Sequence, residues 1–314
     1  MTPDASIIVA TYNRPDAIRS LLESIQKLDW PTDRLEVVVV DDGSSNPIEP
    51  ALKSCASQLK LVVHRQENSG PAVARNTALS LATGKFVALL DDDCRPEPTW
   101  LRRLLDVLES HPDAMVGGHT VNGLPGNIYS TVSQMIVDRV YAAHNADPMH
   151  AGFFTSSNLA VRRELLLSLG GFDPAYRYAG GEDRGLCDHW RNAGGVMIFE
   201  PRARIHHFHE LTFQRFLRQH FNYGRGAIYY HFTRQTKSRE EARTAREIVL
   251  NWNAWSAELA AQAERHNKMA MVALLVCWQF ANALGYFWEM MARFTPFATA
   301  RAGSKRRSTP QNAS

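Results

Sequence analysis

Three consecutive carboxylates, Asp91, Asp92 and Asp93, follow an apolar segment at residues 86–90. Adjacent like charges repel each other, so such a cluster destabilises a fold unless a cation neutralises it. Carboxylate oxygens are the ligands that hard divalent cations prefer, which makes Mg2+ or Mn2+ the natural partner. A solvated acidic turn after a strand is the alternative interpretation. The other polar segments of the chain decide between the two.

Strands and helices alternate along the first third of the chain. Apolar runs predict strands at residues 6–10, 35–40, 86–90 and 196–205. Apolar positions at helical spacing predict helices at residues 15–28, 71–81 and 100–109. This order indicates an α/β fold with a mainly parallel sheet, and such sheets carry ligands at the carboxyl ends of their strands. The acidic run lies at such an end.

Polar loops also follow the first two expected strands. Tyr12 lies in the first loop, and Asp41 and Asp42 lie in the second. A carboxylate there could accept hydrogen bonds from a base or a ribose, and an aromatic ring could stack on the base. Either aspartate could instead only cap a turn. Because three polar loops converge on one sheet edge, we favour a nucleotide site.

Five motifs, in order, resemble those of the family 2 glycosyltransferases, which have the GT-A fold. They are SIIVATYNR at 6–14, VVVDDGS at 38–44, NSGPAVARN at 68–76, LDDD at 90–93, and GGFD at 170–173 followed by GED at 181–183. The resemblance runs from about residue 6 to about residue 232. It implies a GT-A α/β fold with a nucleotide-binding half and an acceptor half. It also implies inverting transfer of a sugar from a nucleotide sugar, by default a UDP-sugar.

The resemblance assigns roles where the motifs match. The implied nucleotide-binding residues are Ala10, Tyr12, Asn13, Asp41, Asp42, Arg75, Asp91 and Asp92. The implied metal ligands are Asp93, as the main ligand, Asp91 and His207, and the implied cofactor is Mn2+ or Mg2+. The metal would neutralise charge on the departing nucleoside diphosphate.

Asp183 is the expected general base. Inversion needs a base that deprotonates the acceptor hydroxyl on the face opposite the leaving group. Glu182 and Asp183 could instead be charges that favour a helix N-terminus. The family often carries another acid two positions after the base, where this chain has Gly185, and Asp188 could compensate.

Several further residues are expected to line the donor or acceptor site. They are Ser157, Asn158, Glu182, Arg218 and His209. The amide and hydroxyl in the segment 153–158 could read sugar hydroxyls. Arg218 or Arg225 could clamp the diphosphate or could be surface charges. A zinc site at His206, His207 and His209 is the competing idea, without a supporting motif.

The domain organisation follows from these motifs. We expect a catalytic domain at 1–235, with its nucleotide-binding half at about 1–95 and its acceptor half at about 96–235. A helical region at 236–299 and a disordered basic tail at 300–314 would follow. Residues 269–288 carry no charge and are long enough to span a bilayer, to lie in its interface, or to cover the core. We expect peripheral membrane attachment, with a lipid-linked or glycan acceptor.

Charge, cysteine spacing and missing motifs argue against other functional classes. A net charge of +3 does not indicate a nucleic-acid partner. Four cysteines without metal spacing fit a reducing cytoplasm, and the first residues do not resemble a signal peptide. The glycine-rich loops of nucleotidyltransferases and NAD-binding enzymes are missing from 10–14. A sugar-nucleotide-binding protein with a degraded site is the non-enzymatic alternative.

Overall fold

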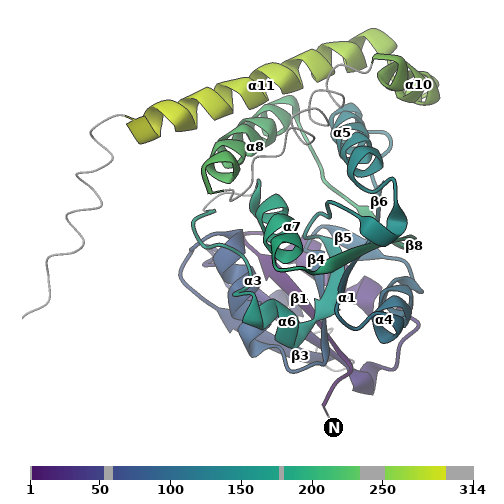
Figure 1. Ribbon diagram of the computed structural model, residues 1–314, viewed down its shortest axis with the longest axis vertical. Helices are drawn as coiled ribbons and strands as arrows, with labels where there is room; N and C mark the ends of the chain where they lie inside the picture. The colour runs from purple at the N-terminus through teal and green to yellow at the C-terminus, as the bar shows by residue number, and fades with distance from the viewer. Residues whose placement is uncertain (1, 53–58, 177–179, 234–251, 295–314) are drawn as a thin grey trace, which may run out of the picture.

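The computed structural model describes residues 2–52, 59–176, 180–233 and 252–294. Within these residues an eight-stranded sheet has helices on both faces, and further helices gather at one end (Figure 1). The strands are β1 (Ala5–Thr11), β2 (Leu35–Asp41), β3 (Lys60–Arg65), β4 (Phe86–Asp91), β5 (Cys94–Pro96), β6 (Ala114–Asn122), β7 (Asn158–Arg162) and β8 (Val196–His207). All four strands expected from the sequence are present.

The strand order is β3-β2-β1-β4-β7-β6-β8-β5. The first four strands are mutually parallel, as are β6 and β8, whereas β7 and β5 run antiparallel to their neighbours. The sheet is therefore mixed, with four parallel and three antiparallel strand pairs, where a mainly parallel sheet was expected. Ala10 pairs with Asp91, and Thr11 pairs with Asp41, so the carboxyl ends of β1, β2 and β4 share one edge. This register places the three polar loops together.

Ten α-helices are described. They are α1 (Pro15–Ile25), α2 (Glu49–Leu52), α3 (Pro71–Leu81), α4 (Trp100–Ser110), α5 (Ile128–His144), α6 (Arg163–Ser168), α7 (Glu182–Asn192), α8 (Phe213–Thr233), α10 (Trp252–Gln262) and α11 (Lys268–Phe294). Short 3-10 turns cover Thr32–Arg34 and Pro148–His150. The first helix ends earlier than expected, although Leu28 beyond it is still buried.

Alternate residues of β1 and β2 belong to different cores, which explains their nearly continuous apolar sequence. Ile7 and Val39 pack with α1 and α4 on one face of the sheet. Ile8 and Val38 pack with α3 and α7 on the other face. All four side chains are at most 1% exposed. The β-branched strand at 35–40 is thus buried on both faces, as its composition predicts.

A third core joins α5, α8, α10 and α11, and Figure 1 shows α11 lying across α8 and α5. Two glycines let α8 and α11 approach closely. A Cβ at Gly224 would lie 1.9 Å from the carbonyl oxygen of Asn282, and one at Gly285 would lie 1.9 Å from that of Phe221. The helices at 252–262 and 268–294 fall in the expected helical region 236–299. The expected basic tail at 300–314 lies outside the described residues.

Candidate active site

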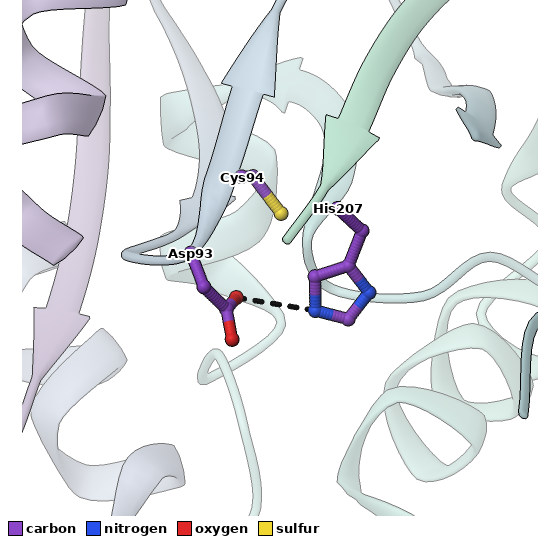
Figure 2. Close-up of side chains that lie close together, drawn as sticks. All are labelled: Asp93, Cys94 and His207. Carbon is purple, nitrogen blue, oxygen red and sulfur yellow. Dashed lines mark ion pairs between the residues drawn. The ribbon is translucent and has the colours of Figure 1, made fainter. Parts of the chain in front are cut away.

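The acidic turn after β4 lies against the end of β8. β4 ends at Asp91, and the chain turns through Asp92 and Asp93 into β5, where Cys94 pairs with His207. The Asp93 Oδ1 atom lies 3.1 Å from Nε2 of His207, with Cys94 beside them (Figure 2). The sheet register therefore builds a carboxylate–imidazole pair from residues far apart in the chain.

This pair fits a divalent cation. The ligand atoms of Asp93, Cys94 and His207 lie within 4.8 Å of one another. Asp91 and His207 line the same cavity. A carboxylate and an imidazole together suit Mn2+, and oxygen ligands suit Mg2+. Asp93 and His207 are therefore the residues that would hold the ion, with Asp91 facing the same space.

Arg14 already supplies positive charge to this turn. Its Nη1 donates to Asp92 Oδ1 at 3.0 Å and to Asp93 Oδ2 at 2.7 Å. The Thr11 hydroxyl donates to the second oxygen of Asp92 at 2.7 Å. Sequence reasoning did not single out Arg14, although it ends the first motif. Only the pairing of β1 with β4 shows that this loop residue reaches the acidic turn.

The charges of this cluster shift one another's protonation. Burial opposes ionisation of Asp93, but His207 and Arg14 hold its pKa well below the usual range. Burial would lower the pKa of His207, yet the Asp93 carboxylate raises it. Burial raises the pKa of Asp92 to about 6, despite Arg14. Burial and the neighbouring His207 lower the pKa of His209 to about 4. His209 is therefore neutral near pH 7 and has a lone pair for a ligand.

The loops after β1 and β2 are tied together. The Asn13 N–H donates to Ser44 Oγ at 2.8 Å, and the Ser45 N–H donates to Asn13 Oδ1 at 2.7 Å. Asn13 takes a left-handed conformation with φ of 57°. Tyr12 between them is 48% exposed, so its ring is open to a stacking partner. Ala10, half-buried, is the next-to-last residue of β1.

Asp41 and Asp42 use their carboxylates to order loops. Asp42 accepts the N–H groups of Ser69 and Gly70, both at 2.9 Å. Asp41 accepts the N–H of Ser44 at 2.9 Å. Both aspartates are buried. Turn capping, the alternative considered for these residues, describes the contact of Asp41 with Ser44, whereas Asp42 bonds to the loop before α3. Direct nucleoside contact stays a prediction.

Arg75 connects the end of β4 to α7. Its guanidinium contacts Asp91 Oδ1 at 2.7 Å and Glu182 Oε1 at 3.1 Å, and its side chain is 9% exposed. Arg75, which the resemblance assigns to nucleotide binding, thus forms ion pairs with two carboxylates of the protein itself. The contact places the α7 N-terminus beside the acidic turn.

Asp183 lies in the first turn of α7, where a glycine pair turns the chain. Gly180 has φ of 138° and Gly181 has φ of 93°, conformations that favour glycine. The Gly180 N–H donates to Glu182 Oε2 at 2.7 Å. Burial and the adjacent Glu182 raise the pKa of Asp183 to about 7, against the opposing effect of Arg75. A carboxylate titrating near neutrality suits general base catalysis.

A cavity of about 700 Å3 brings the two ends of the site together. Its lining includes these predicted residues: Arg75, Asp91, Ser157, Glu182, Asp183, His207 and His209. The predicted residues outside that lining are Ala10, Tyr12, Asn13, Asp41, Asp42, Asp92, Asp93, Asn158 and Arg218. The expected base, Asp183, thus faces the same space as two of the three expected metal ligands, Asp91 and His207, whereas the main expected ligand, Asp93, lies outside that lining.

Two predicted lining residues lie elsewhere. Asn158 is fully buried in β7, where it accepts from the Trp100 indole N–H at 2.8 Å, because a polar group in the core needs a partner. Arg218 is an exposed residue of α8 outside the cavity lining. The other arginine considered, Arg225, pairs with Glu289 of α11 at 2.9 Å.

The structure also shows why Gly185 fits. A Cβ there would lie 3.0 Å from the Tyr176 hydroxyl, so a larger side chain would crowd that ring. Asp188, the possible substitute acid, accepts a hydrogen bond from the Tyr230 hydroxyl and does not line the cavity. Asp188 therefore helps to hold α7 against α8.

Sequence reasoning missed a group of cavity residues on the helices. They include Val137 and Val140 on α5, Arg184 on α7, Tyr223 and Tyr230 on α8, and Trp278 on α11. Tyr223 lies between Arg218 and Arg225, the two arginines considered for the diphosphate, so the sequence did point to α8. The contribution of α11 depends on helix packing, which the sequence alone does not specify.

The family assignment rests on a sequence match. The model of the family described as glycosyl transferase family 2 matches residues 6–170, more than half of the chain. The chain belongs to glycosyl transferase family 2. A solved structure shares the fold. The mannosyltransferase PcManGT from Pyrobaculum calidifontis, solved with GDP-Man and Mn2+, matches with a TM-score of 0.65 at 22% identity, over 92% of this chain and 88% of that one.

Two curated relatives are similar in sequence. The pre-mycofactocin glycosyltransferase of Mycobacterium tuberculosis is 29% identical over 71% of this chain and 47% of its own length. The glucosyl-dolichyl phosphate glucuronosyltransferase of Haloferax volcanii is 26% identical over 64% of this chain and 68% of its own length. The family 2 chain described here thus spans about half the length of the first of these relatives.

Proposed function

We propose that the chain is an inverting glycosyltransferase that moves a sugar from a nucleotide sugar, with a UDP-sugar as the first choice, to an acceptor hydroxyl. The observation that carries the proposal is that Asp183, with a pKa near 7, lines the same cavity as Asp91 and His207. A base and a diphosphate-binding end are what inverting transfer requires.

The proposal assigns a residue to each part of the reaction. Asp183 accepts the proton of the acceptor hydroxyl as its oxygen bonds to the sugar's anomeric carbon. The bond from that carbon to the diphosphate breaks, and the nucleoside diphosphate leaves with the electron pair. Bound Mn2+ or Mg2+, held by Asp93 and His207, would neutralise charge on the diphosphate. Arg14 supports the same end of the site through its hydrogen bonds to Asp92 and Asp93.

The nucleoside would lie over the loops after β1 and β2. Tyr12 offers an exposed ring for stacking, Asn13 ties the two loops together, and Asp42 bonds to the loop before α3. Solved structures with the same fold carry GDP-Man with Mn2+ and UDP with Mn2+, which supports a nucleotide donor and a divalent ion. The H. volcanii relative, named for a dolichyl phosphate substrate, supports a lipid-linked acceptor, and a glycan is the other class.

The decisive experiment is a turnover assay on the full chain. UDP-sugars, GDP-sugars and dTDP-sugars are incubated with Mn2+, and released nucleoside diphosphate is measured with and without added acceptors. Ligand binding to the native state is followed in parallel by thermal shift. Release of a nucleoside diphosphate from one donor supports the enzyme. A stabilising nucleotide sugar that is never turned over would indicate the non-enzymatic sugar-nucleotide-binding protein.

Helix α11 supports peripheral membrane contact. Its outward face carries exposed apolar side chains at helical spacing: Met269, Val276, Phe280, Leu284, Phe287, Trp288 and Met291. The segment Lys268–Ala292 is long and apolar enough to cross a membrane, and 33% of its most apolar window is buried against the protein. The inner face therefore covers the third core, while the outer face, exposed among the residues that the structure describes, suits a membrane interface. We propose a cytoplasmic enzyme that binds the inner membrane surface.

A further inference from the structure

The cavity has lining residues that neither the metal site nor the base accounts for. Asp91, His207 and Asp183 line only part of it. If the hydroxyl that Asp183 deprotonates lies beside it, the rest of the cavity must hold the body of the acceptor. This step rests on the proposed function. The chemistry of that space therefore describes the acceptor class.

More of the cavity surface is apolar than polar. The helices contribute Ile136, Val137 and Val140 on α5, Ala227 on α8 and Trp278 on α11, with polar side chains such as Gln134, Gln219 and Asn282 among them. Most of a ligand site's affinity comes from apolar surface, and a few polar groups fix orientation. Free sugars present hydroxyls on nearly every side and would leave the apolar part of these walls unmatched. An acceptor with an apolar body matches them.

One cation stands beside the base in this space. Arg184 follows Asp183 in α7, is half-buried, and lines the cavity. Its guanidinium lies 5.3 Å from the Phe153 ring centre and 5.7 Å from that of Tyr230. Over the residues that the structure describes, Arg184 has no carboxylate within ion-pair distance, whereas Arg75 has two.

A half-buried guanidinium without a carboxylate is suited to an external anion. Arginine binds carboxylates and phosphates through paired N–H donors, and partial burial strengthens the interaction. The two aromatic rings restrain the side chain, so less side-chain entropy is lost when an anion binds. A carboxylate and a phosphate share this chemistry.

We propose that the acceptor carries an anionic group, bound by Arg184 next to the attacked hydroxyl, together with an apolar body packed between α5, α8 and α11. A charged amphipathic acceptor of this kind is a lipid-type or aryl-type glycoside rather than a neutral free sugar. The carboxylate or phosphate lies on the acceptor's polar end, and the alkyl or aryl group lies on the Trp278 side.

The test uses four probes that differ by one feature each. Octyl glucuronide has the anion and the alkyl body, octyl glucoside lacks the anion, free glucuronate lacks the body, and nitrophenyl glucuronide has an aryl body. Their affinities for the full chain with UDP and Mn2+ are measured by calorimetry. We expect one of the two amphipathic glucuronides to bind at least about tenfold tighter than octyl glucoside or glucuronate, and the better one identifies the body.

Variants separate recognition by Arg184 from a general effect of charge. Arg184→Gln should weaken glucuronide binding about 10- to 100-fold and leave octyl glucoside unchanged, while Arg184→Lys keeps part of the affinity. Arg191→Gln, on the same helix but 43% exposed at its side chain, is the matched control and should change neither. Val140→Asp should weaken both octyl probes.

Three results would overturn the proposal. Octyl glucuronide and octyl glucoside could bind equally well, Arg184→Gln could weaken both equally, or none of the four probes could bind. Binding of UDP with Mn2+ is recorded for every variant. If that binding persists while the discrimination among acceptors fails, only this inference is wrong. If neither nucleotide binding nor turnover is found, the proposed function itself is wrong.

Discussion

Gly226 of α8 lies against the backbone of Gly180, so closely that a Cβ at Gly226 would be 1.8 Å from the Gly180 carbonyl oxygen. Gly180 begins the turn that leads into Asp183. Two positions before Gly226, Gly224 makes the equivalent contact with Asn282 of α11. Helix α8 therefore touches, through its glycines, both the turn that carries the expected base and the helix expected to meet the membrane.

Gly226→Ala should separate α8 from this turn. The methyl group would meet backbone on the other side, which cannot rotate away, so the strain should lower the free energy of unfolding by about 1–3 kcal/mol. Displacement of Asp183 should lower kcat more than donor affinity. Thermal melting and steady-state kinetics measure the two effects. Gly126→Ala, where an added Cβ has nothing within 4 Å, is the control and should behave as wild type.

Removal of the metal ligand should show in binding as well as in activity. Asp93→Ala takes away the carboxylate that lies 3.1 Å from His207, so Mn2+ binding measured by calorimetry should be lost. Transfer should stop, and the Mn2+-dependent part of UDP affinity should disappear. The control is Arg102→Ala, on the exposed face of α4, which should bind Mn2+ and UDP like wild type. Full wild-type activity in excess EDTA would contradict the metal assignment.

Asp183→Asn should lower kcat by about two to four orders of magnitude, because the amide cannot accept the proton. UDP and donor binding should hardly change, since Asp183 acts on the acceptor. Asp188→Asn is the comparison: Asp188 lies outside the cavity lining and should change kcat far less. Near-normal turnover in Asp183→Asn would indicate that Glu182 or Asp188, not Asp183, is the base.

The pH dependence of transfer should report the same carboxylate. Asp183 acts only when ionised, and burial together with Glu182 raises its pKa to about 7, so kcat should rise with pH through that value. Glu182→Gln removes the neighbouring negative charge and should move this limb to lower pH. The stability of the fold should change in the opposite direction to kcat, falling as Asp183 ionises. Ionisation of a buried carboxyl with a raised pKa costs stability, so Asp183→Asn should melt no lower than wild type above pH 7.

The sequence predicted those features that depend on local patterns. The β-branched run 35–40 and the helix 71–81 form as expected because periodicity and turn residues act within a few positions of the chain. The acidic run at 91–93 could be located because three like charges after an apolar strand are unusual. In each case the signal and the structure lie in the same short segment.

The parts that could not be predicted depend on long-range register and packing. Arg14 reaches Asp93 only because β1 pairs with β4, and Trp278 enters the cavity only because glycines bring α11 close to α8. Asn158 was assigned to the site by its motif, yet its side chain bonds to Trp100 in the core. A motif identifies a residue's position in the family pattern but does not show which way its side chain points.

Membrane attachment through α11 should depend on its outward apolar face. The variant Phe280→Ser with Leu284→Ser removes two side chains that are 66% and 62% exposed, so the fold loses little burial while the membrane contact loses much. We expect the wild-type chain to sediment with anionic vesicles and the variant to remain largely in the supernatant, with an unchanged melting temperature.

Val196→Ser, an exposed apolar position on β8, is the matched control and should sediment like wild type. Because the apolar contribution is not screened, wild-type binding should weaken but persist at high salt. Wild-type and variant chains that both stay in the supernatant would show that α11 serves only to cover the third core.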